Sequence, residues 1–173
     1  MNGLLYLTSE DFSPTTQNGK KMMIHSISGF SLILFYSNHC KFCPEYTSLF
    51  KLLPGSVSGC QFGILNVDSN KEFINASKNT ISQINYVPFI LLYVNGVPFM
   101  KYNGPGTIQE LSRFIVEVSK NIQQRQKFSS DVVKKDPSGG IPAYTIGHPL
   151  KNMVCFLEFE EAYDSSGPSR KKK

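Results

Sequence analysis

The feature that most limits how this chain can fold is a nearly continuous apolar run from Phe30 to Tyr36. A run of this length suits one strand, and its lack of polar alternation is typical of a strand covered on both faces of a sheet. A polar turn at 37–39 follows, and between Glu45 and Leu53 the apolar residues recur on one helical face. The run therefore predicts a central buried strand that leads through a short turn into a helix.

The rest of the chain predicts further strands and helices in alternation. Asn95-Gly96 favours a two-residue hairpin turn, and Thr107 with Glu110 forms a capping box at a helix start. The other predicted strands are Leu4–Leu7, Gln61–Val67, Phe89–Val94 and Val97–Asn103. The other predicted helices are a short one near Lys20–His25, one over Lys71–Ile84 and one from Ile108 to about Lys127. From Phe30 onward the order β–α–β–α–β–β–α predicts an α/β domain with a central mixed sheet flanked by helices.

The length of 173 residues suits one globular domain with appendages. We assign residues 1–20 to an N-terminal extension, 21–127 to the domain and 128–173 to a C-terminal extension with a basic tail. The net charge of +5 comes mostly from the four basic residues 170–173, so the folded body is nearly neutral. This balance argues against a nucleic-acid partner of the domain and confines electrostatic contacts to the tail.

The apolar stretches have only strand length, so we expect no membrane span, and we see no targeting signal. The expected compartment is therefore the reducing cytoplasm. There, four cysteines point to catalysis, metal binding or burial more than to a disulfide framework.

The motif Cys40-Lys41-Phe42-Cys43 lies where the central strand passes into the helix. A thiolate at a helix N-terminus is favoured by unpaired N–H groups and the helix dipole, and Lys41 adds positive charge. Cys43, one turn further, is placed to form a disulfide with Cys40 or to resolve a mixed one. The motif predicts thiol–disulfide exchange with Cys40 as nucleophile and Cys43 as resolving thiol, and it requires no cofactor.

The cysteines and histidines of this chain allow other interpretations. A Cys-x-x-Cys pair can be half of a zinc site, but the remaining Cys60, Cys155 and the three histidines include no second pair at ligand spacing. We therefore expect no metal. Cys60 is predicted in the core and Cys155 as a small hydrophobe in a packed segment. His39 is either a solvated turn residue or a proton partner of the cysteines.

The run from Phe30 to about Ile122 resembles thioredoxin. The resemblance lies in the buried strand, the Cys-x-x-Cys at its end, the strand ending Asn66-Val67-Asp68, the pair Val87-Pro88 and the Asn-Gly hairpin. It implies a thioredoxin fold with N- and C-terminal extensions. The flanks are similar to thioredoxin-like proteins encoded by large DNA viruses of eukaryotes, in the segments Tyr6–Phe12, Ile141–Tyr144 and Phe156–Tyr163.

The resemblance also implies site residues. In the family the proline at the position of Pro88 is cis and leaves the preceding backbone, here Val87, open to an extended substrate segment. Lys41, Phe42, Val87 and Pro88 are accordingly the predicted substrate-binding residues. The alternative is an ordinary trans proline that opens an edge strand.

Three departures from the family pattern concern proton transfer and the helix. The family's buried acid is replaced by Leu34, the tryptophan before the first cysteine by His39, and the later helix proline is missing although Pro44 follows Cys43. Without the carboxylate, proton removal from Cys43 should be slow unless water or His39 assists. The pattern favours a slow or dedicated oxidoreductase.

The C-terminal third contains a linker signal at 136–140 and two apolar segments, Ile141–Tyr144 and Met153–Phe159. These segments are apolar enough to pack on this domain or on a partner. A chain cut after Lys135 should keep a folded core if the C-terminal third is an appendage. Residues 165–173 are expected to form a solvated tail.

Two functional hypotheses follow. In the first, the protein is a thiol–disulfide oxidoreductase that acts on protein disulfides and dithiols in the cytoplasm of a host cell. In the second, the fold is a structural or interaction module, such as a minor capsid or virion-associated protein, whose C-terminal extension contacts virion or capsid proteins. The intact motif with Val87-Pro88 favours the first; Leu34 and the apolar C-terminal segments favour the second. We prefer the first.

Overall fold

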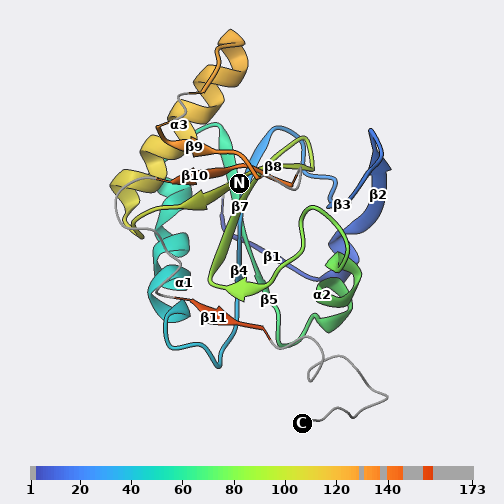
Figure 1. Ribbon diagram of the computed structural model, residues 1–173. Helices are drawn as coiled ribbons and strands as arrows, with labels where there is room; N and C mark the ends of the chain where they lie inside the picture. Colours follow the sequence, from blue (N-terminus) through green and yellow to red (C-terminus); the bar gives the residue numbers. More distant parts are fainter. Residues whose placement is uncertain (1–2, 129–130, 137–139, 146–153, 158–173) are drawn as a thin grey trace.

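The fold is seen in a computed structural model that describes residues 3–128, 131–136, 140–145 and 154–157. Figure 1 shows a central sheet with helices on both sides. Seven strands form the main sheet in the order β1-β5-β4-β7-β8-β10-β9. Their bounds are β1 Leu5–Leu7, β4 Phe30–Tyr36, β5 Cys60–Asn66, β7 Phe89–Val94, β8 Val97–Asn103, β9 Val133–Lys134 and β10 Ala143–Thr145. The helices are α1 Cys43–Leu52, α2 Lys71–Ser77 and α3 Ile108–Gln124.

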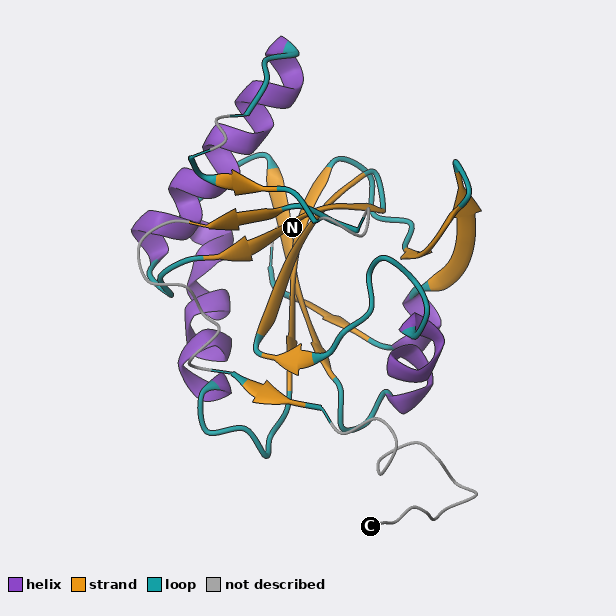
Figure 2. Cartoon of the chain, in the orientation of Figure 1, coloured by secondary structure: helices purple, strands orange, loops and turns teal. Residues whose placement is uncertain are grey.

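Strand β4 is central, as its apolar run predicted. It pairs in parallel with β5 and antiparallel with β7, so that Leu34 lies opposite Ile64 on one side and Ile90 on the other. Its side chains alternate between two buried clusters: Leu34 belongs to the cluster that includes residues of α1 and α3, and Phe35 to the cluster that includes residues of α2. The sheet thus separates two apolar cores, with α1 and α3 on one face and α2 on the other (Figure 2).

Helix α3 shows how local sequence sets its bounds. The Thr107 side chain accepts a hydrogen bond from the Glu110 N–H at 3.2 Å, which caps the first turn. The helix ends at Gln124, and the following residue Arg125 has left-handed φ and ψ of 56° and 36°. The buried face of α3 consists of Leu111, Phe114, Ile115 and Val118.

The prediction of a helix near Lys20–His25 is wrong. These residues form strand β3 (Lys20–Ile24), which pairs with β2 (Ser13–Gln17) in a separate hairpin. The turn is Asn18-Gly19, and both residues have positive φ, the conformation that suits a tight two-residue hairpin. The turn at Asn18-Gly19 therefore determines the structure of residues 20–24, in spite of their helical pattern.

The predicted helix over Lys71–Ile84 is shorter than expected, because α2 ends at Ser77. The Ser77 hydroxyl donates to the Ile74 carbonyl oxygen at 2.7 Å, and the Thr80 hydroxyl donates to the Ser77 carbonyl oxygen at 2.6 Å. Such side-chain bonds offer the backbone an alternative to helix continuation. Lys78 is extended and Asn79 has a φ of 66°, so the chain leaves the helix there.

Part of the C-terminal third belongs to the main sheet. Strand β10 pairs in parallel with β8, and its Tyr144 is only 1% exposed. The Tyr144 ring packs on Phe114 with 4.8 Å between ring centroids, and its hydroxyl donates to Glu117 at 2.7 Å. Ile141, also buried, belongs to the opposite core. The segment after Lys135 therefore contributes to both cores.

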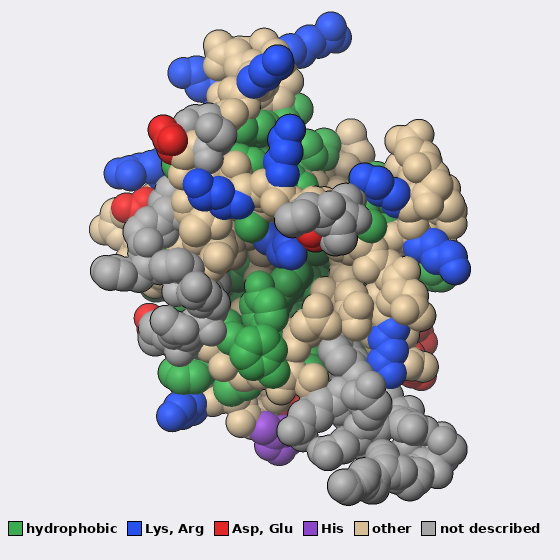
Figure 3. Space-filling model, in the orientation of Figure 1, with side chains coloured by type: hydrophobic (Ala, Val, Ile, Leu, Met, Phe, Trp, Pro, Cys, Tyr) green, Lys and Arg blue, Asp and Glu red, His purple; other side chains and the backbone are tan. Residues whose placement is uncertain are grey.

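Two further short strands pair away from the main sheet. Strand β6 (Tyr86–Val87) pairs antiparallel with β11 (Cys155–Phe156). Figure 3 shows apolar side chains gathered on this face of the molecule, over β6 and β11. In the part of the chain that the structure describes, no helix is long and apolar enough to cross a membrane.

Candidate active site

The loop between β4 and α1 is held by the end of β5. The Ser37 hydroxyl donates to one carboxylate oxygen of Asp68 and the Asn38 N–H donates to the other, both at 2.8 Å. The Ser37 oxygen also accepts from the His39 N–H at 3.0 Å. These bonds fix the residues just before Cys40, so the cysteine lies at the carboxyl edge of the sheet.

Cys40 is bonded to Cys155, 115 residues later in the chain, with 5.9 Å between the two Cα atoms. Cys43 is a free thiol. The interpretation of Cys155 as no more than a small hydrophobe is therefore wrong, and in this structure Cys40 has Cys155 as its partner in place of the predicted Cys43. Cys155 does also pack against the core that contains Cys40.

The segment that carries Cys155 lies along β6 as an extended strand. Cys155 is opposite Val87 and Phe156 is opposite Tyr86, with 5.9 Å between the two aromatic rings. The Leu157 N–H donates to the Asn85 carbonyl oxygen at 2.8 Å. An extended segment of this chain thus takes the backbone position that was predicted for a substrate.

Val87 and Pro88 lie beside Cys40. Their peptide bond is cis, as the resemblance implied, and the alternative of a trans proline is wrong. The Cys40 Sγ lies 3.6 Å from the Val87 carbonyl oxygen. A sulphur bonded to Cys40 is therefore held next to the backbone edge of β6.

Cys43 is the first residue of α1 and is 1% exposed. Burial raises the pKa of its thiol, the nearby Ser37 N–H opposes this rise, and the Asp68 charge adds to it. The Ser37 nitrogen lies 3.5 Å from the Cys43 Sγ. Cys43 is thus a protonated, enclosed thiol, and it lies at the helix start instead of one turn beyond it.

The other predicted site residues surround the motif. Lys41 is exposed, and its ammonium nitrogen lies 5.2 Å from the centroid of the Phe42 ring. Phe42 precedes the first helical residue of α1 and packs against the core that contains Cys40. His39 is exposed, and its role as a proton partner stays a prediction.

A sequence profile of the family Thioredoxin matches residues 6–117. This chain belongs to the thioredoxin family. It is also 33% identical to uncharacterized protein 196R of Invertebrate iridescent virus 6, over 97% of this chain and 98% of that protein. Uncharacterized protein 020R of Invertebrate iridescent virus 3 is 32% identical over 93% and 96% of the two chains.

Among solved structures, a mutant thioredoxin from Halobacterium salinarum is similar, with 17% identity and a TM-score of 0.48. The match covers 67% of this chain and 90% of that one. The similarity to the viral proteins extends over nearly the whole chain, so it is not confined to the part that matches the thioredoxin family.

Leu34 stands where the resemblance to thioredoxin implied an acid, and the structure shows a different carboxylate near the Cys43 thiol. Leu34 is fully buried in the apolar core on the side of α1 and α3. Asp68, at the end of β5, is the carboxylate whose charge acts on Cys43. Ser37 and Asp68 were not predicted as site residues. The feature that could have identified them is that both follow the carboxyl ends of neighbouring parallel strands. Such strand ends lie at the same edge of a sheet.

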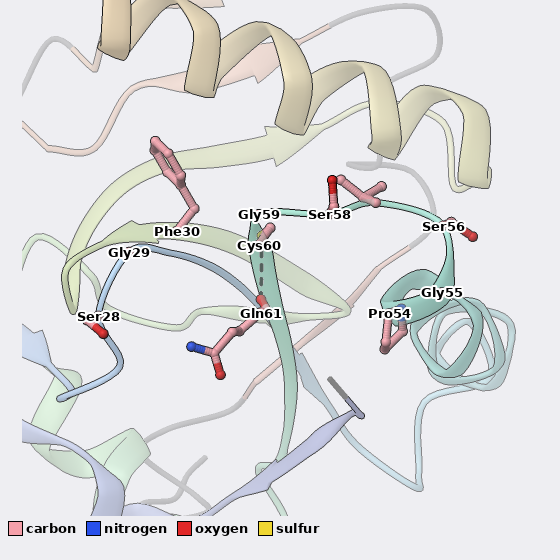
Figure 4. A pocket seen from close by; sticks show the side chains of 11 residues that line it. Ser28, Gly29, Phe30, Pro54, Gly55, Ser56, Ser58, Gly59, Cys60 and Gln61 are labelled. Atoms are coloured by element: carbon pink, nitrogen blue, oxygen red, sulfur yellow. Dashed lines mark hydrogen bonds between the residues drawn. The ribbon is translucent and has the colours of Figure 1, made fainter. Parts of the chain in front are cut away.

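Cys60 lies at the other end of β5, opposite Phe30 in the register with β4. It lines a hollow formed mainly by the turns at 28–30 and 54–61, where its Sγ lies 3.5 Å from the Gln61 carbonyl oxygen (Figure 4). Burial raises the pKa of Cys60 to about 12, with a smaller opposing effect of the Leu32 backbone. Cys60 is therefore separate from the candidate site and poorly ionised.

Within the described ranges, no group of three or more His, Cys, Asp or Glu side chains is placed to hold a metal ion.

Proposed function

We propose that this protein is a thiol–disulfide oxidoreductase that acts on protein disulfides and dithiols, with Cys40 as nucleophile and Cys43 as resolving thiol. One observation carries the proposal. Cys40 is already joined to a cysteine of an extended segment, and that segment pairs with Val87 just before cis-Pro88. This is the arrangement that a mixed disulfide with an extended protein substrate would require.

The reaction begins at Cys40. Its thiolate attacks one sulphur of a substrate disulfide, so that a Cys40–substrate bond forms and the substrate S–S bond breaks. The second substrate sulphur leaves as a thiolate and takes a proton from water. Cys40 carries out this step because its sulphur lies 3.6 Å from the Val87 carbonyl oxygen, at the backbone edge where an extended substrate would pair.

The second step belongs to Cys43. After losing its proton, Cys43 attacks the Cys40 sulphur, forms the Cys40–Cys43 disulfide and releases the reduced substrate. Two electrons pass from the protein to the substrate, and the reverse sequence oxidises a dithiol. Because burial and the Asp68 charge raise the pKa of Cys43, few molecules carry the required thiolate at neutral pH. The second step should therefore be slow, in line with a dedicated enzyme.

The proposed binding surface is the backbone edge of Val87 together with Pro88, Phe42 and Lys41. The edge of β6 supplies backbone hydrogen bonds to any extended segment, as it does to β11. Phe42 offers an apolar contact next to the reacting sulphur, and the exposed Lys41 favours a substrate with nearby acidic groups.

Reduction of a synthetic peptide disulfide by the dithiothreitol-reduced protein tests this proposal. We expect the Cys40→Ser variant to lose the reaction, and the Cys60→Ser variant to keep the wild-type rate because Cys60 is remote. A variant with both Cys43→Ser and Cys155→Ser should accumulate the peptide as a mixed disulfide on Cys40, because no second thiol of the site is left to displace it. Equal rates for wild type and Cys40→Ser would contradict the proposal and leave the interaction-module hypothesis.

A further inference from the structure

The segment 154–157, here called the C-terminal segment, closes the candidate site. With it in place, Cys40 is only 3% exposed. The backbone of Val87, which a substrate would need, is paired with Cys155. An external segment therefore cannot reach both the sulphur of Cys40 and the edge of β6 while the C-terminal segment is bound there.

The contacts of the C-terminal segment other than its disulfide are few. Strand β11 has only two residues, and its Phe156 is 70% exposed. Among the described residues, one hydrogen bond from Leu157, the ring contact of Phe156 with Tyr86, and partial packing of Val154 and Leu157 on the two cores complete the contact. A two-residue strand pair with an exposed aromatic side chain gains little from burial, so the Cys40–Cys155 bond is the main restraint.

Cys43 is placed to break that bond. It follows Cys40 by one turn, and its N–H donates to the Cys40 carbonyl oxygen at 3.2 Å. It is a free thiol in the same core as Cys40 and Cys155. The three cysteines thus form one group around a single exchangeable disulfide.

We propose that Cys155 is a third redox-active cysteine of this site, an internal substrate that exchanges with Cys43 for the sulphur of Cys40. The Cys43 thiolate attacks the Cys40 Sγ; the Cys40–Cys43 bond forms and the Cys40–Cys155 bond breaks. The electron pair leaves on the Cys155 sulphur, which takes a proton from water, while the proton of Cys43 has passed to water. No oxidant or reductant is consumed, because both forms contain one disulfide.

The exchange links the position of the disulfide to the access of a substrate to the backbone edge of Val87. In the closed form, Cys40–Cys155, the C-terminal segment covers β6; in the open form, Cys40–Cys43, the main restraint on the segment is gone and the edge of Val87 becomes available. The inference rests on the proposed function, since it requires Cys40 to exchange disulfides. It adds that the protein carries its own competitor for protein substrates.

Tryptic mapping of the oxidised full-length protein tests the exchange directly, because Lys41 lies between Cys40 and Cys43. The protein is oxidised with glutathione disulfide, and its free thiols are then blocked with N-ethylmaleimide at acidic pH before digestion. The closed form joins peptide 22–41 to peptide 152–170, and the open form joins peptide 22–41 to peptide 42–51. We expect the 22–41/152–170 product to dominate in wild type and in the Cys60→Ser control.

A second measurement follows the access of an external thiol to Cys40. A peptide with one thiol in an extended sequence is mixed with the oxidised protein, and formation of the mixed disulfide on Cys40 is timed. If about nine-tenths of wild-type molecules are closed, Cys155→Ser should react about tenfold faster, since its whole population is open. Cys43→Ser should react more slowly than wild type, because its closed form has no internal route to the open one.

The outcomes separate this inference from the proposed function. Cys40–Cys43 as the only disulfide, together with equal rates for wild type and Cys155→Ser, would overturn the inference and leave the oxidoreductase proposal standing. A protein in which glutathione disulfide forms no bond at Cys40 would overturn both. The tryptic mapping of wild type needs no substitution, so it determines which cysteine is bonded to Cys40 even if a variant fails to fold.

Discussion

At the scale of single residues, two cysteines of one motif have different surroundings. Cys40 lies beside the backbone of Val87, whereas Cys43 begins α1 with the Asp68 charge nearby, although both are buried in the same core. The sequence could predict that Cys40 and Cys43 lie close together, since their spacing alone carries that information. It could not predict the partner Cys155, because a bond across 115 residues depends on where the chain returns.

The effect of Asp68 on Cys43 can be measured. In a Cys40→Ser background, Asp68→Asn should lower the pKa of Cys43, because the negative charge that disfavours the thiolate is removed while an oxygen remains to accept from Ser37. The alkylation rate of Cys43 as a function of pH in the reduced protein reports this pKa. Glu72→Gln, at an exposed position on α2, is the matched control. An unchanged Cys43 profile in Asp68→Asn would show that the Asp68 charge does not contribute to the pKa.

His25 makes the fold sensitive to acid. Burial lowers its pKa from 6.5 to about 4, against a smaller opposing effect of the Asp11 charge. Its Nδ1 accepts from the Ile27 N–H at 3.1 Å and its Nε2 lies 3.2 Å from the Ser31 oxygen, so the folded state requires the neutral ring. As pH falls, the unfolded chain takes up this proton first, and stability is lost between the two pKa values.

We expect His25 alone to reduce the free energy of unfolding by about 3 kcal/mol on full titration. Urea unfolding between about pH 7 and about pH 5 should show falling stability in wild type and a flatter profile in His25→Asn, whose side chain does not titrate. Parallel profiles for the two proteins would assign the acid sensitivity to other groups.

At the scale of elements, the strands and helices with strong local signals were predicted well. The bounds of β4, β7 and β8 match the expectation, and the cap at Thr107 starts α3 as predicted. Apart from the β2–β3 hairpin, the elements missed were short or stabilised by distant partners. Strand β10 forms because it pairs with the edge of β8, and strand β11 is held in place because Cys155 is bonded to Cys40. Neither β8 nor Cys40 is near its partner in the sequence.

Two truncations test how the C-terminal elements contribute. A chain ending at Thr145 keeps β10 and should stay folded, whereas a chain ending at Lys135 loses the buried Ile141 and Tyr144. Loss of each large buried side chain costs about 3 kcal/mol, so the shorter chain should be unfolded or nearly so. Thermal unfolding followed by circular dichroism compares the two. Equal midpoints would mean that residues 136–145 are an appendage after all.

For the molecule as a whole, the thioredoxin fold places three sulphur atoms next to the backbone edge of β6. The fold itself could be predicted, because an apolar central strand, a Cys-x-x-Cys and Val87-Pro88 each constrain the same arrangement. What could not be predicted is that the chain occupies its own binding edge with β11. The proposed control of access to Cys40 is therefore a property of the full chain and not of the domain alone.

If Cys40 undergoes reversible thiol–disulfide exchange, its oxidation state must follow the potential of the surrounding buffer. A redox titration of the full-length protein against glutathione buffers measures this, with the oxidation state of every cysteine followed by alkylation and mass spectrometry. We expect one reversible two-electron transition that Cys40→Ser abolishes and Cys60→Ser leaves unchanged. A Cys40 that keeps the same state across the whole range of buffers would contradict it, and the protein would then be a thioredoxin-family scaffold without redox activity.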